Sequence, residues 1–345
     1  MYKSIKVIIF LIAITINTLG SPTKYHSDKT VIMTEIECNS NGIKKACNTN
    51  AYLYNDFQAD GAYVGLSEAL KFEVSLAAIY SRGASANYIG DFQVASNIDA
   101  STDLLIYTGT VGYEFTGLHN LNATAGLIDL NSIYDVTDSS GYLINSSFGI
   151  SAALSANGAF SIYPKPGYAL NLSMDYDSDK FNMGLFDANP TKRSNPFSDG
   201  IFSIGQWKHF FNTNTNMQVG GWISSTSTGY THGLYLNAEH HIEDTATLFA
   251  RLATSSGVAT VVPLGFEIGC LTGVPFSDKK DDLFSIGIAQ ARFDSGSYET
   301  TYEITYQRVQ HEWLTLQPDI QYIQNLSGIS NKNAIVATMR VIFNF

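Results

Sequence analysis

The chain has 345 residues, a formal net charge of −11 and only 15% charged residues, whereas soluble domains carry about 25%. This acidic balance, without a basic patch to neutralise phosphates, argues against a nucleic-acid partner. Tyr and Phe are abundant, at 20 each. Few charges with many aromatic residues are typical of a membrane barrel that has a lipid-facing surface and a water-filled lumen.

The first 20 residues are predicted to be a cleaved signal peptide. Lys3 and Lys6 precede an apolar run over 7–16, and the segment ends in Thr-Leu-Gly at 18–20. A short membrane anchor is the alternative, but this run is too short to span the roughly 30 Å of a bilayer as a helix. No later stretch approaches about 18 uninterrupted apolar residues, so no transmembrane helix is predicted.

Residues 21–60 are polar and irregular, and we predict that they form a periplasmic extension ahead of the barrel. Cys38 and Cys47 bracket the polar loop 39–46, and in a secreted chain we expect them to form a disulfide. Closing so short a loop would stabilise it by roughly 2–3 kcal/mol. Metal binding is the alternative, although two Cys without a nearby His or second Cys pair make a poor zinc site. Cys270 is left over, and we expect it to be a small buried residue.

From about Gly61 onward, segments of alternating apolar and polar residues are separated by clusters of Gly, Asn, Asp and Ser. In the segment 103–115, this alternation places Tyr107 and Val111 on the lipid-facing side and Glu114 on the other. Sixteen strands are predicted, at 61–68, 71–80, 88–96, 103–115, 121–128, 168–176, 181–187, 200–210, 215–224, 231–241, 246–255, 261–270, 283–293, 299–310, 313–323 and 334–345. An even count is what single-chain bacterial barrels require.

The last predicted strand, 334–345, has the clearest alternation. Its odd-numbered positions, from Ile335 to Phe345, are all apolar, whereas Arg340 and Asn344 lie on the opposite face. An amphipathic strand that ends on an aromatic residue is similar to the closing strand of bacterial outer-membrane barrels. Phe345 is therefore predicted to be the end that the barrel-assembly machinery binds.

The connections between these strands predict a topology. With both ends of the barrel in the periplasm, periplasmic turns should be short and outer loops longer. The short connections at 116–120, 177–180, 211–214, 242–245 and 310–312 all fall on the periplasmic side, and 271–282 is a long exception. The longest connection, roughly 129–167, becomes the third outer loop. Since barrels of 16–18 strands leave an aqueous lumen, this loop is predicted to fold inward and narrow it.

Several long motifs resemble the carbohydrate-selective porins, often called the OprB family. They are G-L-I-D-L-N-S-I-Y-D-V at 126–136, I-N-S-S-F-G-I at 144–150, Y-P-K-P-G-Y at 163–168, Y-E-I-T-Y at 302–306, W-L-T-L-Q-P-D-I-Q-Y-I at 313–323, and N-A-I-V at 333–336 with Arg340. The resemblance spans roughly 55–345. Two family features are absent: the Asp-Trp-Gly-Gly opening before Gly61, and a Pro-Gly-Gly that is here Leu-Ser-Gly at 326–328, after Asn325.

The resemblance implies an all-β protein, a transmembrane antiparallel barrel of about sixteen strands in the Gram-negative outer membrane. It implies passive diffusion of sugars and similar small polar solutes, with no reaction and no cofactor. The implied partners are these solutes and outer-membrane lipid, with a homo-oligomer as a possibility. The alternatives from other classes are a barrel-type enzyme and an adhesin or soluble lectin. An enzyme would need a Ser and a His together at the membrane rim, and we find no such arrangement.

A diffusion channel needs a constriction lined by hydrogen-bonding and charged groups. The candidates on the inward strand faces are Glu73, Glu114, Arg251, Glu303, Asp319 and Arg340, and those in the long loop are Asp129, Asn131, Asp135, Asn145 and Ser146. Two other interpretations stay open. The loop residues could cap short helices and bind their own backbone, and the strand charges could pair across the barrel wall.

A metal site is not predicted. The Glu239-His240-His241 stretch contains two adjacent His, but successive side chains of a strand point to opposite faces, so a solvated turn is the preferred interpretation. The chain contains no phosphate-binding loop, HExxH or Gly-x-Ser-x-Gly motif.

Overall fold

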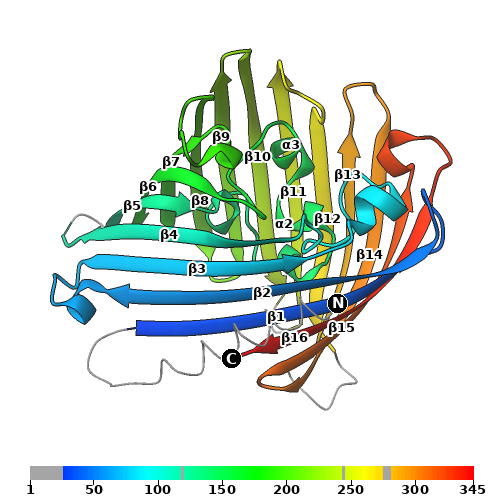
Figure 1. Ribbon diagram of the computed structural model, residues 1–345, viewed down its shortest axis with the longest axis horizontal. Helices are drawn as coiled ribbons and strands as arrows, with labels where there is room; N and C mark the ends of the chain where they lie inside the picture. The colour runs from blue at the N-terminus through cyan, green and yellow to red at the C-terminus, as the bar shows by residue number, and fades with distance from the viewer. Residues whose placement is uncertain (1–25, 118–119, 243–244, 275–280) are drawn as a thin grey trace.

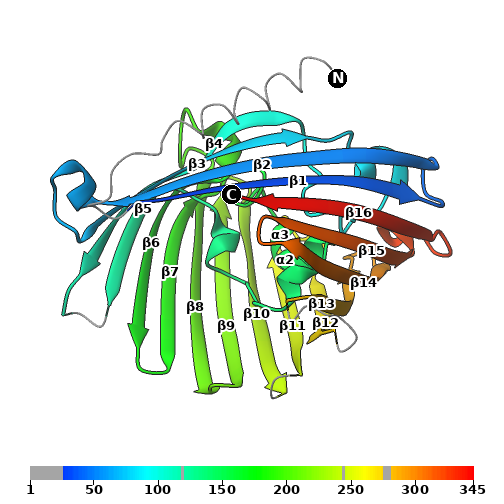
Figure 2. The same ribbon diagram turned by 90° about the horizontal axis from the view of Figure 1, so that it is seen from below.

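The computed structural model describes residues 26–117, 120–242, 245–274 and 281–345. They form one closed antiparallel barrel in which each of the sixteen strands pairs with its sequence neighbours and β16 pairs with β1 (Figures 1 and 2). The predicted all-β barrel of sixteen strands is therefore confirmed. No helix in the described ranges is long and apolar enough to cross a membrane.

The strands are β1 (His26–Asn39), β2 (Ala46–Asp60), β3 (Leu70–Tyr80), β4 (Asp103–Phe115), β5 (Leu121–Ile128), β6 (Gly167–Tyr176), β7 (Asp179–Asp187), β8 (Gly200–Asn212), β9 (Thr215–Thr226), β10 (Gly229–Ile242), β11 (Ala246–Gly257), β12 (Leu264–Gly273), β13 (Leu283–Arg292), β14 (Tyr298–His311), β15 (Leu314–Gln324) and β16 (Ala334–Asn344). The connections contain short helices, namely η1 (Gly61–Val64), η2 (Ser85–Ile89), η3 (Leu130–Ser132), η4 (Ser140–Tyr142), α2 (Ser146–Gly149), α3 (Ala152–Ser155), η5 (Pro190–Lys192) and η6 (Leu326–Gly328).

The alternation in the terminal strand sets one face outward and one inward. Ile335 exposes 50% of its surface, whereas its neighbour Val336 is completely buried. The chain end is paired as well: Thr30 and Phe345 exchange two backbone hydrogen bonds, of 3.0 and 2.9 Å, where β1 meets β16. Pairing of β16 with β1 removes both sheet edges, which a barrel must do to span lipid.

The prediction of an N-terminal extension over 21–60 is wrong for the residues that the structure describes. Residues 26–60 form β1 and β2, which are full members of the barrel. The pattern was missed because the inward face of β1 carries Glu35, Glu37 and Asn39, which look irregular beside a short outward apolar face. The predicted signal peptide, 1–20, lies outside the described residues.

Two of the predicted strands are also wrong. The segment 61–68 contains the helix η1 and a turn at Gly65 (φ 81°), and 88–96 contains the end of η2 followed by irregular backbone. Gly90 (φ 81°) and Val94 (φ 58°) adopt left-handed conformations that break a strand. Two missed strands and two false ones offset each other, so the count of sixteen was right although its members were not.

The order of the strands divides the connections between two rims. We call the rim with His26 and Phe345 the terminal rim and the opposite one the loop rim. The turns predicted to be periplasmic, including 177–178 and 213–214, lie on the terminal rim, and 275–280 of the long exception lie outside the described residues. The segment 129–166 is the third connection on the loop rim, and we call it loop 3. Cys38 and Cys47 form a disulfide between β1 and β2 beside the first connection on that rim.

One strand face differs from the prediction because of a bulge. The register between β3 and β4 shifts between Val74 and Leu76, and such a shift moves all following side chains to the other face. Ile106 is therefore exposed outward, and Tyr107, predicted to face lipid, is only 7% exposed and points inward.

Candidate functional site: the barrel lumen

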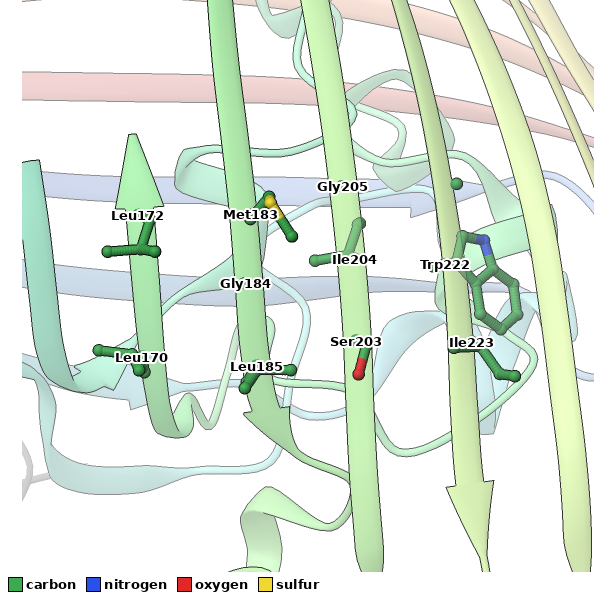
Figure 3. A pocket seen from close by; sticks show the side chains of 11 residues that line it. Leu170, Leu172, Met183, Gly184, Leu185, Ser203, Ile204, Gly205, Trp222 and Ile223 are labelled. Carbon is green, nitrogen blue, oxygen red and sulfur yellow. The ribbon is translucent and has the colours of Figure 1, made fainter. Parts of the chain in front are cut away.

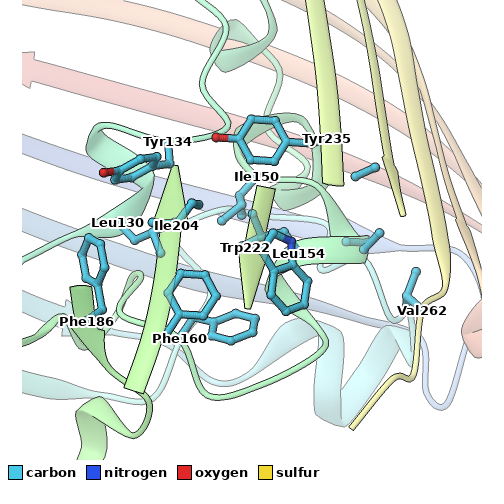
Figure 4. Packing of buried hydrophobic residues seen from close by; sticks show 14 of the residues in the cluster. Leu130, Tyr134, Ile150, Leu154, Phe160, Phe186, Ile204, Trp222, Tyr235 and Val262 are labelled. Atoms are coloured by element: carbon cyan, nitrogen blue, oxygen red, sulfur yellow. The ribbon is translucent and has the colours of Figure 1, made fainter. Parts of the chain in front are cut away.

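Loop 3 packs against the inner side of the barrel through an apolar cluster. Phe160 contacts Phe202 and Trp222 with ring centroids 4.5 and 5.4 Å apart, and Tyr134 lies 6.0 Å from Phe186. Figure 4 shows these side chains of loop 3 against β7, β8 and β9. Burying a Phe side chain stabilises a structure by about 1.5–3 kcal/mol, so inward aromatic residues on these strands favour a loop over open water.

Inward glycines let loop 3 approach the strands closely. A Cβ atom at Gly287 would lie 2.6 Å from Leu143 Cδ1 and from Phe148 Cε1. At Gly265, a Cβ atom would lie 3.0 Å from Ser151 Oγ. The loop helices α2 and α3 lie within the ring of strands in both views (Figures 1 and 2). The positions of these glycines therefore determine where the helices can rest.

Arg251 on β11 binds the backbone and one carboxylate of loop 3. Its guanidinium donates to the carbonyl oxygens of Phe148 at 2.7 Å and Asp135 at 2.9 Å, and it pairs with the Asp135 carboxylate at 3.1 Å. Asp135 also accepts from the amide of Asn237 at 3.0 Å and from the N–H of Ser151 at 2.8 Å. Both charged groups are buried and have protein partners, although Arg251 Nε makes no hydrogen bond and lies 3.9 Å from the Glu267 carboxylate. Arg251 and Asp135 therefore hold the loop and do not face open lumen.

Two strand carboxylates accept hydrogen bonds from N–H groups of loop 3. Glu303 on β14 accepts from the backbone of Ile144 and of Asn145, the latter at 3.0 Å. Glu239 on β10 accepts from the backbone of Ser139 at 2.8 Å. Glu303 and Glu239 are 1% and 2% exposed. These acids replace the water that would otherwise solvate the loop backbone.

Arg340 binds the second connection on the loop rim, 81–102, and a neighbouring acid. Its guanidinium lies 3.0 Å from the Glu35 carboxylate and donates to the side chain of Asn97 at 2.8 Å. Asp319 on β15 accepts from Gln321 at 3.1 Å. Arg340 and Asp319 are 4% and 3% exposed. Both side chains face inward, as predicted, and they bind other groups of the protein.

The remaining loop candidates cap short helices. Asp129 accepts from the backbone of Asn131 at 2.9 Å, and Asn145 accepts from the backbone of Ser147 at 3.0 Å, at the starts of η3 and α2. Asn131 donates to the carbonyl oxygen of Gly149 at 3.0 Å. Burial raises the pKa of Asp129 to about 6, although the donors Tyr107 and Asn131 oppose this shift. These three residues therefore bind the backbone of their own loop, as the alternative interpretation of the sequence proposed.

A different wall carries the side chains that remain accessible. Glu73 on β3 is half-buried and accepts from the hydroxyl of Thr108 at 2.8 Å. Glu114 on β4 is exposed and lies 3.4 Å from the Lys71 amino group. They line a pocket of about 380 Å³ with the following further residues: Gln58, Ala59, Phe72, Thr110, Gly112 and Thr124. This pocket presents acids, a base, hydroxyls and an amide together.

The lumen thus has two unlike sides. We call the inward faces of β7 to β15, which bind loop 3, the loop-contacting wall. The inward faces of β2 to β5 near the terminal rim, around the pocket of Glu73 and Glu114, are the open wall. Nearer the loop rim, Tyr163 of loop 3 packs on Tyr52 and Tyr107 of the same strands, with ring centroids 5.7 and 6.3 Å apart. Of the eleven candidates from the sequence, Glu73 and Glu114 lie on the open wall. Five belong to loop 3 itself, namely Asp129, Asn131, Asp135, Asn145 and Ser146. The other four are buried strand residues, namely Arg251, Glu303, Asp319 and Arg340.

Several residues that line the lumen were not predicted from the sequence. Lys71 on β3 and Thr110 on β4 occupy inward positions that strand parity indicates, but they were not among the candidates. Gln58 was missed because β2 was not predicted. Glu35 was missed because its strand was assigned to an extension. Glu239 was considered only as a neighbour of two His, which donate or accept locally: His240 with Thr215 at 2.9 Å, and His241 with Thr247 at 2.8 Å. Within the described residues, no group of three or more metal-ligating side chains was found.

A second hollow lies on the outer face and is apolar. About 400 Å³ in volume, it is formed where Gly205 and Gly221 leave space between larger side chains of β6 to β9. Figure 3 shows Leu172, Met183 and Ile223 around it. Met183 is 68% exposed, so this hollow belongs to the lipid-facing surface and not to the solute path.

Comparison with known proteins bears on both fold and family. Residues 224–345 match the family described as "Carbohydrate-selective porin, OprB family". No curated protein matches the chain. The high-pH structure of Pseudomonas putida OprB is similar over 93% of this chain and 94% of that one, with a TM-score of 0.82 at 15% identity.

The low-pH structure of the same protein covers 93% of this chain and 92% of that chain, with a TM-score of 0.64 at 14% identity. A mutant of the Rh. blastica porin covers 93% and 100%, with a TM-score of 0.65 at 11% identity. The family resemblance seen in the sequence is confirmed in the C-terminal third of the chain. The barrel has the fold of these porins, and residues 224–345 are similar to the carbohydrate-selective porins of the OprB family.

Proposed function

We propose that this protein is an outer-membrane channel for the passive, selective diffusion of sugars and similar small polar solutes. The observation that carries this proposal is the open wall, where Glu73, Glu114, Lys71 and Thr110 offer acceptors and donors inside a closed barrel. Sugar hydroxyls can exchange hydrogen bonds with such groups as they leave water. The family match over 224–345 supports the same solute class.

Loop 3 would set the width of the channel. It occupies the side of the lumen along the loop-contacting wall, and its contacts with Arg251, Glu303 and Glu239 are made by buried groups. Solutes would then pass between loop 3 and the open wall. In this proposal Glu73 and Glu114 contact solute, whereas Asp135, Asn145 and Arg251 keep the loop in place.

The barrel resides in the outer membrane of a Gram-negative bacterium, as its fold and family resemblance indicate. Its porin fold points to transport and not to catalysis, and the enzyme and adhesin alternatives are not favoured. We further propose that residues 1–20 direct secretion and that the assembly machinery binds the β16 strand at Phe345. Outward Phe343 stacks on Trp313 with centroids 6.2 Å apart, which extends an aromatic surface to this end.

The transport proposal is tested with purified, folded protein. Planar bilayers containing it should show stable open conductance, and liposomes containing it should swell in monosaccharide solutions. A solute panel with charged controls would define the preference. If heat-modifiable, correctly folded protein shows neither conductance nor swelling, the channel proposal is wrong.

A further inference from the structure

We propose that the loop rim carries an anion site for a phosphorylated sugar, formed by Lys44, Lys45 and Lys332. These residues line a pocket of about 380 Å³ with three asparagines, Asn41, Asn331 and Asn333, and with Gly42 and Ile43. The site is separate from the lumen residues discussed above. The inference uses the position of the loop rim at the cell surface, and it does not depend on sugar transport.

The pocket is built from two connections that lie far apart in the sequence. Residues 40–45 join β1 to β2, and residues 325–333 join β15 to β16. The first is closed at its base by the disulfide of Cys38 and Cys47. The Asn39 amide donates to the carbonyl oxygen of Lys44 at 3.0 Å, which ties the strand end to the turn. The pocket is therefore shaped by covalent and hydrogen-bonded structure.

The backbone of two of the lysines is fixed. Lys44 N–H donates to the carbonyl oxygen of Tyr88 at 2.9 Å, and the Lys332 carbonyl oxygen accepts from Leu326 at 2.7 Å. Gly42 (φ 128°) presses against the neighbouring connection so closely that a Cβ atom there would lie 2.3 Å from the Ile89 carbonyl oxygen. A fixed backbone reduces the conformational entropy that these two residues lose when a ligand binds.

The site is positively charged, whereas the chain as a whole is negatively charged. The protein has a net charge of −11, yet none of the ion pairs in the described ranges involves these three amino groups. Lys44 Nζ lies 5.6 Å from the centre of the Tyr88 ring, a contact that leaves its positive charge uncompensated by an acid. Three ammonium groups without a carboxylate partner around one hollow attract a multivalent anion, and phosphate accepts several charge-assisted hydrogen bonds. The pocket is larger than a phosphate alone, and the asparagine amides can bind sugar hydroxyls. A phosphorylated sugar meets both requirements.

Such a ligand could be the headgroup of an outer-leaflet glycolipid or a soluble sugar phosphate. The test compares wild-type protein with the variant Lys44→Gln/Lys45→Gln/Lys332→Gln. The control variant Lys29→Gln/Lys180→Gln/Lys208→Gln removes the same charge from the terminal rim. Each full-length protein is purified in neutral, phosphate-free detergent, and heat-modifiable mobility verifies folding.

Calorimetry with glucose 6-phosphate, and with glucose for comparison, measures the binding of a soluble sugar phosphate. Lipid binding is measured separately. The protein is incubated with phosphatidylcholine vesicles that contain bis-phosphorylated lipid A, and native mass spectrometry then determines how much lipid A the protein retains. We expect the loop-rim variant to bind at least one probe about tenfold more weakly or worse, and the control variant to match wild type. Loss of lipid A binding alone identifies the headgroup, and loss of glucose 6-phosphate binding alone identifies a free solute. Equal binding by wild type and the loop-rim variant, or no binding of either probe by wild type, overturns the proposal.

Discussion

The loop-contacting wall and the open wall have similar residue types and opposite tasks. Glu303 on the first wall is 1% exposed and accepts two backbone N–H groups of loop 3. Glu73 on the second wall is half-buried and accepts one side-chain hydroxyl. The comparison teaches that an inward charge in a barrel is not by itself a solute contact. What decides its role is whether a loop covers it.

Deleting residues 131–145 should have the largest effect, because it removes Tyr134 from the apolar cluster and the backbone N–H groups that Glu239 and Glu303 bind. Single-channel conductance should rise severalfold and discrimination between sugars of different size should fall. Planar-bilayer recording of folded protein checks this. An unchanged conductance would mean that loop 3 does not form the constriction.

The substitution Glu303→Leu should follow. It leaves the N–H groups of Ile144 and Asn145 without their acceptor, at a cost of about 1–3 kcal/mol for each. The loop should detach more often, which increases current noise and lowers the thermal midpoint. Glu73→Leu is the matched control, since it loses one hydrogen bond from a half-buried site. Equal destabilisation by the two substitutions would contradict the difference between the walls.

Gly287→Ala should displace loop 3 by overpacking. The added methyl group would lie 2.6 Å from Leu143 and Phe148, and such insertions cost about 1–3 kcal/mol. Gly141→Ala in the same loop is the control, because nothing lies within 4 Å of its Cβ position. We expect planar-bilayer recordings to show raised conductance for Gly287→Ala and wild-type conductance for Gly141→Ala. Equal conductance of the two variants would mean that the contact at Gly287 does not position loop 3.

Glu73→Gln/Glu114→Gln should alter selectivity without altering stability. Removing two negative charges from the open wall should lower the preference for cations, measured as the zero-current potential across a salt gradient. Glu267→Gln on the loop-contacting wall, where Glu267 is 1% exposed, should leave that potential unchanged. A larger shift of the zero-current potential with Glu267→Gln would mean that ions pass along the loop-contacting wall.

The smallest expected effect concerns pH. Since burial raises the pKa of Asp129 to about 6 from about 3.9 in an unfolded chain, the folded state favours the neutral acid. Its contribution to stability is therefore largest below about pH 4, decreases between about pH 4 and 6, and is constant above. Asp129→Asn should flatten that part of the pH dependence by about 1–2 kcal/mol, as measured by urea unfolding in lipid vesicles. An unchanged profile would mean that Asp129 ionises freely in the folded protein.

The sequence predicted most of the strands of the barrel, but it did not predict which inward side chains contact one another. Alternation placed the residues of β16 correctly, since Ile335 faces out and Arg340 faces in. Alternation predicts which face of the sheet a side chain lies on, but not which residue it contacts. It therefore could not predict the ion pair between Arg340 and Glu35. It also failed at Tyr107, where a bulge reverses the face, and in β1, whose inward acids resemble an irregular segment.

Loop 3 shows a second limit. Its motif was recognised at 126–136, but Asp129 and Asn131 bind their own backbone, as short polar side chains in loops commonly do. The signal for its docking was present in the inward aromatic residues Phe186, Phe202 and Trp222. Inward aromatic residues in a lumen that should be polar indicate that something apolar covers them.

The most direct test of the two walls is thiol accessibility from water. In a Cys270→Ser background, Thr110→Cys places a thiol on the open wall, and Ser285→Cys places one at an inward position of β13 that is 1% exposed. A charged methanethiosulfonate reagent is added during planar-bilayer recording. We predict a stepwise drop in conductance with the thiol at 110 and no change with the thiol at 285. A drop at 285 with no reaction at 110 would contradict the assignment of the solute path to the open wall.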